Sequence, residues 1–177
     1  MSRVLVTGGV RSGKSALAES VAAATGNAVC YVATATRGDG EMSARIRQHQ
    51  ARRPAHWDLL EVPLALGAAL DGRAATGAPA LLVDCMSLWL SNLLCAEDDT
   101  LMEEERAAFL AALGRYPGDV VVVSNEVGLG LIGMDPLSRR FADELGHLNQ
   151  ALAAECDTVV LTVAGLPMPL KGALPAR

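Results

Sequence analysis

The sequence has 177 residues, 51% of them hydrophobic, and a formal net charge of −5. This length suits one domain with a substantial core, so we expect a single domain over residues 1–177. The composition excludes a membrane-spanning helix, because no apolar stretch approaches the ~20 residues of a membrane span. It also argues weakly against nucleic acid as the main partner, because there is no basic excess.

The first predicted elements are a strand at Arg3–Val6 and a helix at Lys14–Ala24, joined by the glycine-rich octet Gly8–Ser15. The octet reads GGVRSGKS, which fits the pattern G-x-x-x-x-G-K-S of a phosphate-binding P-loop between a strand and a helix. Glycines let backbone N–H groups converge on phosphate oxygens, and the helix N-terminus adds a favourable dipole. Lys14 would reach the β- and γ-phosphates, and the Ser15 hydroxyl would hold Mg²⁺. The octet therefore predicts binding of a nucleoside triphosphate.

Apolar runs and helix-period stretches alternate along the rest of the chain, which predicts an α/β fold. Near-continuous apolar strands are typical of a sheet buried on both faces, so we expect a P-loop NTPase-like, mostly parallel, doubly wound sheet with helices on both faces. The segment from residue 165 to 177 holds three prolines and is expected to be an ordered loop with a loose terminus. The further strands are predicted at Ala28–Ala33, Ala80–Asp84, Asp119–Ser124 and Thr158–Val163, and the further helices at Gly40–Arg52, Leu64–Leu70, Leu101–Leu113 and Leu137–Ala154.

The four cysteines show neither metal-ligand spacing nor a paired histidine. Cys30, Cys85 and Cys156 lie in or beside apolar runs, so they are expected to be buried free thiols of a reducing compartment. The chain also enters its first strand at once, which argues against a cleaved signal peptide. Both observations predict a cytoplasmic protein.

Ligands of such sheets gather at the carboxyl ends of the strands, so the residues after each strand are candidates. Asp84 ends an apolar strand, where P-loop proteins typically hold Mg²⁺. A helix N-cap is the alternative role for Asp84, and the P-loop favours the metal. The small segment Ala33–Ala35 follows another strand and would line the nucleotide site. Ser124–Gly130 brings two polar side chains, a carboxylate and two glycines to the same edge, where substrate contact and plain turn chemistry both remain open.

The predicted helix Gly40–Arg52 carries His49 with arginines on the same face. Arg45, His49 and Arg52 or Arg53 are spaced at i, i+4 and i+7 or i+8. A neutral histidine can attack phosphorus while arginines hold the phosphate and offset the developing charge. A solvated basic face is the commoner explanation for such a pattern on an isolated helix, and the local pattern leaves it open.

Together these segments resemble one family over nearly the whole chain, the bifunctional adenosylcobinamide kinase / adenosylcobinamide-phosphate guanylyltransferase of cobalamin biosynthesis. The P-loop, the R-I-x-x-H element that ends at His49, and the S-N-E-V-G of Ser124–Gly128 occur in this order and are far more specific than a P-loop alone. The other matching segments are Tyr31–Ala35, Arg53–Trp57, Glu61 with Pro63, Leu82–Leu94, and the stretch from Leu137 through Arg140, Phe141, Gly146, Asn149 and Gln150 to Ala164–Pro167.

The resemblance implies two reactions on a corrinoid. The γ-phosphoryl group of ATP or GTP first goes to the aminopropanol hydroxyl of adenosylcobinamide. GMP from GTP then goes to the new phosphate through a GMP–histidine intermediate, which gives adenosylcobinamide-GDP and pyrophosphate. The family's histidine corresponds to His49, with Lys14 as the second catalytic residue and Mg²⁺ held by Ser15 and Asp84. The resemblance also implies a homotrimer with the histidine helix near a subunit boundary.

The resemblance extends to the residues that contact the nucleotide. A carboxylate at Glu61 would accept both N1–H and N2–H₂ of guanine and so prefer GTP over ATP. From the local pattern alone, Glu61 is a surface carboxylate at a strand end. The implied nucleotide-binding residues are Gly8, Gly9, Val10, Arg11, Ser12, Gly13, Lys14, Ser15, Ala33, Thr34, Ala35, Gln50, Ala51, Arg52, Arg53, Glu61 and Asp84.

The chain departs from the family pattern at two places. Val10 replaces a smaller alanine and is expected to crowd the P-loop slightly, and Leu131–Met134 replaces a valine-proline. Two other functions fit the P-loop: a simple metabolite kinase and a non-catalytic GTP-sensing module. Neither needs the arginine–histidine face around His49. The sequence does not identify the base of the kinase step, for which Glu126 is only a candidate.

Overall fold

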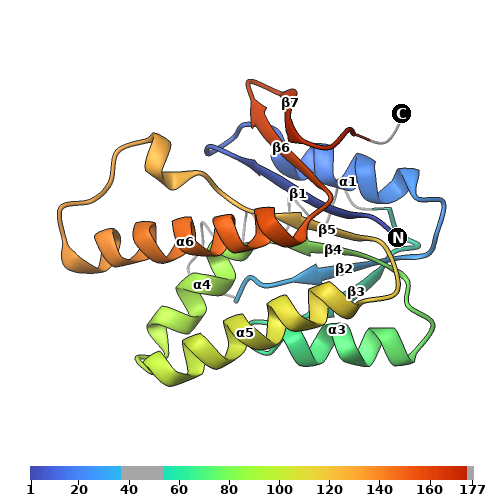
Figure 1. The fold of residues 1–177 in the computed structure, drawn as a ribbon, viewed down its shortest axis with the longest axis horizontal. Coiled ribbons are helices and arrows are strands. Elements are labelled where there is room, and N and C mark those ends of the chain that lie inside the picture. The colour runs from blue at the N-terminus through green and yellow to red at the C-terminus, as the bar shows by residue number, and fades with distance from the viewer. Residues whose placement is uncertain (37–53, 175–177) are drawn as a thin grey trace.

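The computed structural model describes residues 1–36 and 54–174 of the chain. Its centre is a seven-stranded sheet with the order β3-β2-β4-β5-β1-β6-β7 (Figure 1). Neighbouring strands are parallel except for β6 and β7, which confirms the predicted mostly parallel α/β fold. The strands are β1 (Arg3–Gly8), β2 (Val29–Ala33), β3 (Asp58–Glu61), β4 (Ala80–Asp84), β5 (Val120–Val123), β6 (Thr158–Val163) and β7 (Leu166–Lys171).

Helices cover both faces of the sheet, as predicted, but unequally (Figure 1). Among the described residues, one face is covered by α1, whose apolar side packs on β1, β4 and β5. The other four α-helices cover the opposite face and pack on one another. The helices are α1 (Lys14–Ala24), α3 (Leu66–Ala75), α4 (Met86–Cys95), α5 (Asp99–Arg115) and α6 (Pro136–Glu155), with a 3₁₀ helix η1 (Val127–Leu129).

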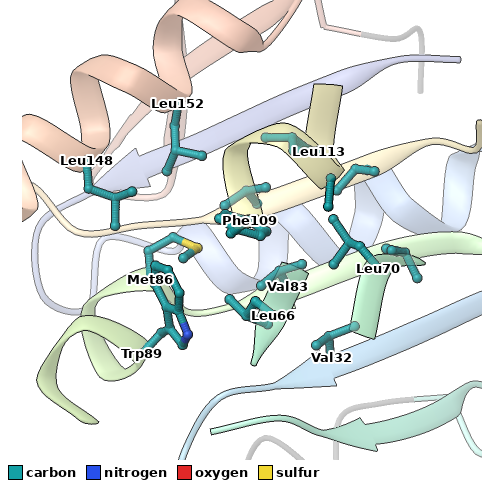
Figure 2. Packing of buried hydrophobic residues seen from close by; sticks show 14 of the residues in the cluster. Val32, Leu66, Leu70, Val83, Met86, Trp89, Phe109, Leu113, Leu148 and Leu152 are labelled. Carbon is teal, nitrogen blue, oxygen red and sulfur yellow. The ribbon is translucent and has the colours of Figure 1, made fainter. Parts of the chain in front are cut away.

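The central strands are buried on both faces, and this explains their continuous apolar sequences. In β5, Val120 and Val122 belong to the core under α3–α6, whereas the alternate residues Val121 and Val123 belong to the core under α1. Figure 2 shows the larger core, in which side chains of four helices meet those of the strands. Trp89 of α4 packs against Phe109 of α5 with 5.5 Å between ring centroids, and its indole N–H donates to the Leu64 carbonyl at 2.6 Å.

Helix α4 is absent from the predicted elements although the sequence carries its signal. Its buried residues Met86, Trp89, Leu90, Leu93 and Leu94 repeat at i, i+3, i+4, i+7 and i+8, the helix period. The helix follows β4 after one residue, so strand and helix form one apolar run without a polar boundary. That residue, Cys85, is the N-cap of α4. The alternative role of Asp84 as the helix N-cap is therefore wrong.

The C-terminal segment differs from the predicted loop because it forms β7, antiparallel to β6. Pro167 and Pro169 lie in this edge strand, where the missing N–H groups leave no inner ladder bond unpaired. Strand β3 and η1 are also unpredicted, and each has four residues or fewer. The predicted helix Gly40–Arg52 falls outside the described residues. Within the described ranges, no helix is both long and apolar enough to cross a membrane.

Candidate active site

Five strand ends line up at the carboxyl edge of the sheet. In the strand register, Val6 of β1 lies beside Val123 of β5, which lies beside Asp84 of β4. Asp84 lies beside Ala33 of β2, and Ala33 lies beside Glu61 of β3. The fold thus brings three predicted site residues into one row with the strand that carries the P-loop.

The P-loop is closely packed at two of its glycines. A Cβ on Gly8 would lie 2.5 Å from the Thr162 carbonyl oxygen and 2.6 Å from Ser12 Oγ. Gly13 has φ of +94°, and a Cβ there would lie 3.1 Å from Cα of Gly165. The Gly165 N–H donates to the Ser12 carbonyl at 2.8 Å, so the turn between β6 and β7 supports the loop. Space therefore requires glycine at Gly8, and the left-handed backbone conformation favours it at Gly13.

The middle of the P-loop faces solvent. Val10 is 79% exposed, and its side chain lies outside the closely packed part of the loop. Gly9 and Arg11 are exposed as well. Ser12 is buried instead, and its hydroxyl has no hydrogen-bond partner in the described part of the chain.

Lys14 begins α1 and folds back over the loop. Its Nζ donates to the Gly9 carbonyl at 3.0 Å. Burial lowers the pKa of Lys14, and the nearby Cys85 thiol and Asp84 carboxylate partly offset this effect. Among the described residues, Lys14 is thus a half-buried cation whose hydrogen-bond partner is a neutral carbonyl, an environment that favours binding of an anion.

Asp84 and Thr34 are linked across β2 and β4. The Tyr31 hydroxyl donates to Asp84 Oδ2 at 3.1 Å. The fully buried Thr34 hydroxyl donates to the Cys85 carbonyl at 2.8 Å and accepts from the Cys85 N–H at 2.9 Å. Asn92 Nδ2 donates to the Thr34 carbonyl at 2.8 Å. The Thr34 side chain therefore joins the ends of β2 and β4.

The tip of β5 forms a polar network around Glu126. Glu126 Oε1 accepts from Thr7 Oγ1 at 2.8 Å and from Asn149 Nδ2 at 3.1 Å, and the Glu126 N–H donates to the Gly8 carbonyl at 3.1 Å. The Asn149 side chain also pairs with Ser124 Oγ at 2.5 Å. Sequence reasoning misses Asn149, although a polar residue within the apolar face of a predicted helix is a signal for such a role.

An apolar groove of about 370 Å³ begins one residue after Glu126. Leu131 is fully exposed at its edge, and with its neighbours it belongs to the segment that departs from the family pattern. The groove is lined by Ser91, Leu94 and Cys95 of α4, by Val127, Leu131, Ile132 and Gly133, and by Leu137, Ser138, Phe141 and Ala142 of α6.

The predicted catalytic histidine lies outside the described residues. His49 and the nucleotide-binding candidates Gln50, Ala51, Arg52 and Arg53 all fall in the segment that the structure does not describe. Within the described ranges, no group of three or more histidine, cysteine, aspartate or glutamate side chains is arranged to hold a metal ion.

The P-loop between β1 and α1, with a carboxylate at the end of a parallel strand nearby, defines a P-loop nucleotide-binding protein. An ATPase of this kind of architecture, EscN of the enteropathogenic E. coli type III secretion system, superposes with a TM-score of 0.56 at 11% identity, over 92% of this chain and 43% of that longer chain. The likeness shows the fold alone.

The chain belongs to the cobinamide kinase / cobinamide phosphate guanyltransferase family, whose model matches residues 4–170. It is 57% identical over 170 residues to the bifunctional adenosylcobalamin biosynthesis protein CobP of Pseudomonas aeruginosa, covering 96% of this chain and 98% of that protein. It is 39% identical over 183 residues to the protein CobU of the same description from Salmonella typhimurium, covering 95% of this chain and 99% of that protein. The family expected from the sequence motifs is confirmed.

Proposed function

We propose that this chain catalyses two successive transfers in cobalamin biosynthesis. It phosphorylates the aminopropanol hydroxyl of adenosylcobinamide with ATP or GTP, and it then transfers GMP from GTP to that phosphate, releasing pyrophosphate. The observation that carries the proposal is the row of Asp84, Ala33 and Glu61 beside the P-loop strand, in a chain that matches this family over nearly its full length.

We assign the phosphates to the P-loop, from Gly8 to Ser15. Its backbone N–H groups and the α1 N-terminus attract anions. Lys14 would exchange its single bond to the Gly9 carbonyl for phosphate oxygens. A buried hydroxyl without a partner costs about 1–3 kcal/mol, and a bound ligand would give the Ser12 hydroxyl a partner.

A P-loop enzyme that uses nucleotides works with a divalent cation, and we propose Mg²⁺ held by Ser15 and Asp84. Hydroxyl and carboxylate oxygens are the hard ligands that Mg²⁺ prefers. Asp84 fits the role, because Tyr31 holds only its Oδ2 and its charge reaches Lys14. When bound, the ion would supply positive charge to the phosphate oxygens.

We assign the base end of the nucleotide to Ala33–Ala35 and Glu61. Four strand spacings separate β1 from β3, roughly 19 Å across the sheet, so a nucleotide along this edge would have its phosphates at the P-loop and its base near Glu61. Glu61 is exposed, as a carboxylate that reads guanine must be. It would favour GTP because adenine lacks the paired donors of guanine.

We keep His49 as the residue that carries GMP, flanked by the nucleotide contacts Gln50–Arg53. The R-I-x-x-H pattern of the family supports this assignment. We also propose, from the resemblance and the composition, one domain, a cytoplasmic location, a homotrimer, and no role for nucleic acid.

The test is covalent labelling with GTP that carries its label on the α-phosphate. We expect label on the denatured wild-type protein that is lost in acid, stable in base and absent from His49→Ala. His56→Ala, a second histidine substitution at an exposed residue, is the matched control and should keep the label.

Two results would contradict the proposal. Label on His49→Ala at the wild-type level would move the intermediate to another residue. A wild type that binds GTP and takes no label would leave a kinase or a GTP sensor.

A further inference from the structure

The two proposed transfers differ in whether the acceptor must lose a proton. The acceptor of the first is a hydroxyl, whose proton must leave as its oxygen bonds to phosphorus. The acceptor of the second is a phosphate, which is already ionised at neutral pH. Only the phosphoryl transfer therefore gains from a general base.

Among the described residues, three carboxylates end strands or follow them at the carboxyl edge: Asp84, Glu61 and Glu126. Asp84 is bonded to Tyr31 and is the proposed metal ligand. Glu61 lies four strands away from the P-loop strand. Glu126 follows β5, the strand between β1 and β4, and is thus the carboxylate after the strand that pairs with the P-loop strand β1.

The contacts of Glu126 fix one carboxylate oxygen and leave the other available. Oε1 accepts from Thr7 at 2.8 Å and from Asn149 at 3.1 Å, whereas Oε2 has no hydrogen bond within residues 1–36 and 54–174. Asn149 is itself fixed, because its Oδ1 accepts from Ser124 and its Nδ2 also donates to the Asn125 carbonyl at 2.9 Å. A rigidly held carboxylate with one unpaired oxygen is the arrangement that a general base needs.

The position of Glu126 also suits an acceptor that arrives from outside the nucleotide site. Its N–H is bonded to Gly8, the first residue of the P-loop. The next residue, Val127, lines the apolar groove of about 370 Å³ between α4 and α6. Glu126 thus connects the start of the P-loop, where we assign the phosphates, with an apolar surface that suits a large, partly apolar corrinoid.

We propose that Glu126 is the general base of the phosphoryl transfer and takes no part in the guanylyl transfer. Oε2 takes the proton of the corrinoid hydroxyl as the hydroxyl oxygen forms its bond to the γ-phosphorus. The bond between the γ-phosphorus and the bridging oxygen breaks, and the nucleoside diphosphate leaves with that electron pair. Glu126 then releases the proton to solvent. The inference rests on the proposed function.

The experiment compares the two half-reactions in Glu126→Gln. Glutamine keeps a carbonyl oxygen to accept from Thr7 and Asn149, so the network and GTP binding should persist. We expect phosphoryl transfer to adenosylcobinamide to fall about 100-fold or more, in kcat rather than KM. Guanylyl transfer to adenosylcobinamide phosphate supplied directly should stay within about threefold of wild type. Glu144→Gln is the matched control, because that carboxylate pairs with Arg106 and not with the P-loop.

Rescue by formate, a small carboxylate that can replace the missing side chain, is a second measurement. It would show no effect if Glu126 had only a structural role. Glu126→Ala should lose phosphoryl transfer and regain part of it when formate is added, whereas Glu126→Gln should not respond. Three results would overturn this inference and leave the proposed function intact. They are phosphoryl transfer within threefold of wild type in Glu126→Gln, an equal loss of both half-reactions in that variant, and a Glu126→Ala that formate does not rescue. A wild type without phosphoryl transfer would overturn the proposed function as well.

Discussion

At the residue scale, Lys14 is expected to cost stability in the protein without nucleotide. Burial lowers the pKa of Lys14, so at neutral pH the folded state holds a poorly solvated cation. This cost is complete below the folded-state pKa and is relieved as the pH rises through that value toward 10.5, the value in the unfolded chain. A residue that costs stability until its ligand arrives is typical of a binding site.

We therefore predict that Lys14→Met leaves the melting temperature without nucleotide unchanged or higher and abolishes the rise that GTP produces in the wild type. Lys171→Met, at the chain's other lysine, is the control. Lys171 donates to the carbonyls of Ala153 and Ala154 near the end of α6, so its loss should lower the melting temperature and keep the GTP response. A full GTP response in Lys14→Met would contradict the assigned phosphate contact.

At the element scale, the hairpin of β6 and β7 supports the P-loop through its turn. Ala164 and Gly165 have φ of +51° and +79°, and the Gly165 N–H holds the Ser12 carbonyl. We predict that Gly165→Ala lowers the free energy of unfolding by roughly 1–2 kcal/mol, because an L side chain is strained in this conformation, and that it weakens GTP binding. Urea unfolding and GTP titration measure the two effects.

Gly146→Ala is the matched control for that glycine. Gly146 lies inside α6, and a Cβ there would meet nothing within 4 Å. Alanine should stabilise this helix by about 0.5–1 kcal/mol and leave GTP binding unchanged. If both glycine variants changed stability in the same direction, the role assigned to the turn would be wrong.

At the scale of the whole molecule, the described residues include two exposed apolar surfaces. One follows η1 and includes Leu131 and Met134, and the other is β7 with Leu166 and Leu170. Exposed groups of apolar side chains are typical of surfaces that contact other molecules. We predict a homotrimer, with a mass by light scattering about three times the 18.4 kDa of the chain. Leu131→Lys and Leu166→Lys would show which surface joins the subunits, and a wild type that keeps the mass of one chain at all concentrations would contradict the trimer.

The sequence predicts those parts of the fold whose signals are local. Helix α1 agrees with its predicted bounds because the P-loop fixes its start and Thr25-Gly26 its end. Prediction from local signals fails where β4 and α4 join at Cys85 without a polar boundary between them. It also fails in β7, because its prolines are typical of a loop. Local signals also fail for short elements such as β3, which pairs only with β2 at the sheet edge.

The candidate site is predictable as a set of residues and not as an arrangement. The sequence places Asp84 and Glu126 at strand ends, but the strand order that puts Glu126 beside the P-loop depends on pairing between distant segments. The role of Asn149 likewise emerges only when α6 packs beside β1 and η1. The roles proposed for His49 and the residues after it remain predictions, since the structure does not describe that segment.

The strand that carries the P-loop has a consequence for the order of events during synthesis. β1 is made first, yet its two neighbours in the sheet, β5 and β6, come from residues 120–123 and 158–163. The turn that holds the Ser12 carbonyl is made later still. On the ribosome the phosphate loop emerges long before anything can hold its shape. The contact that supports the nucleotide site therefore forms only after the turn at residues 164 and 165 has been synthesised.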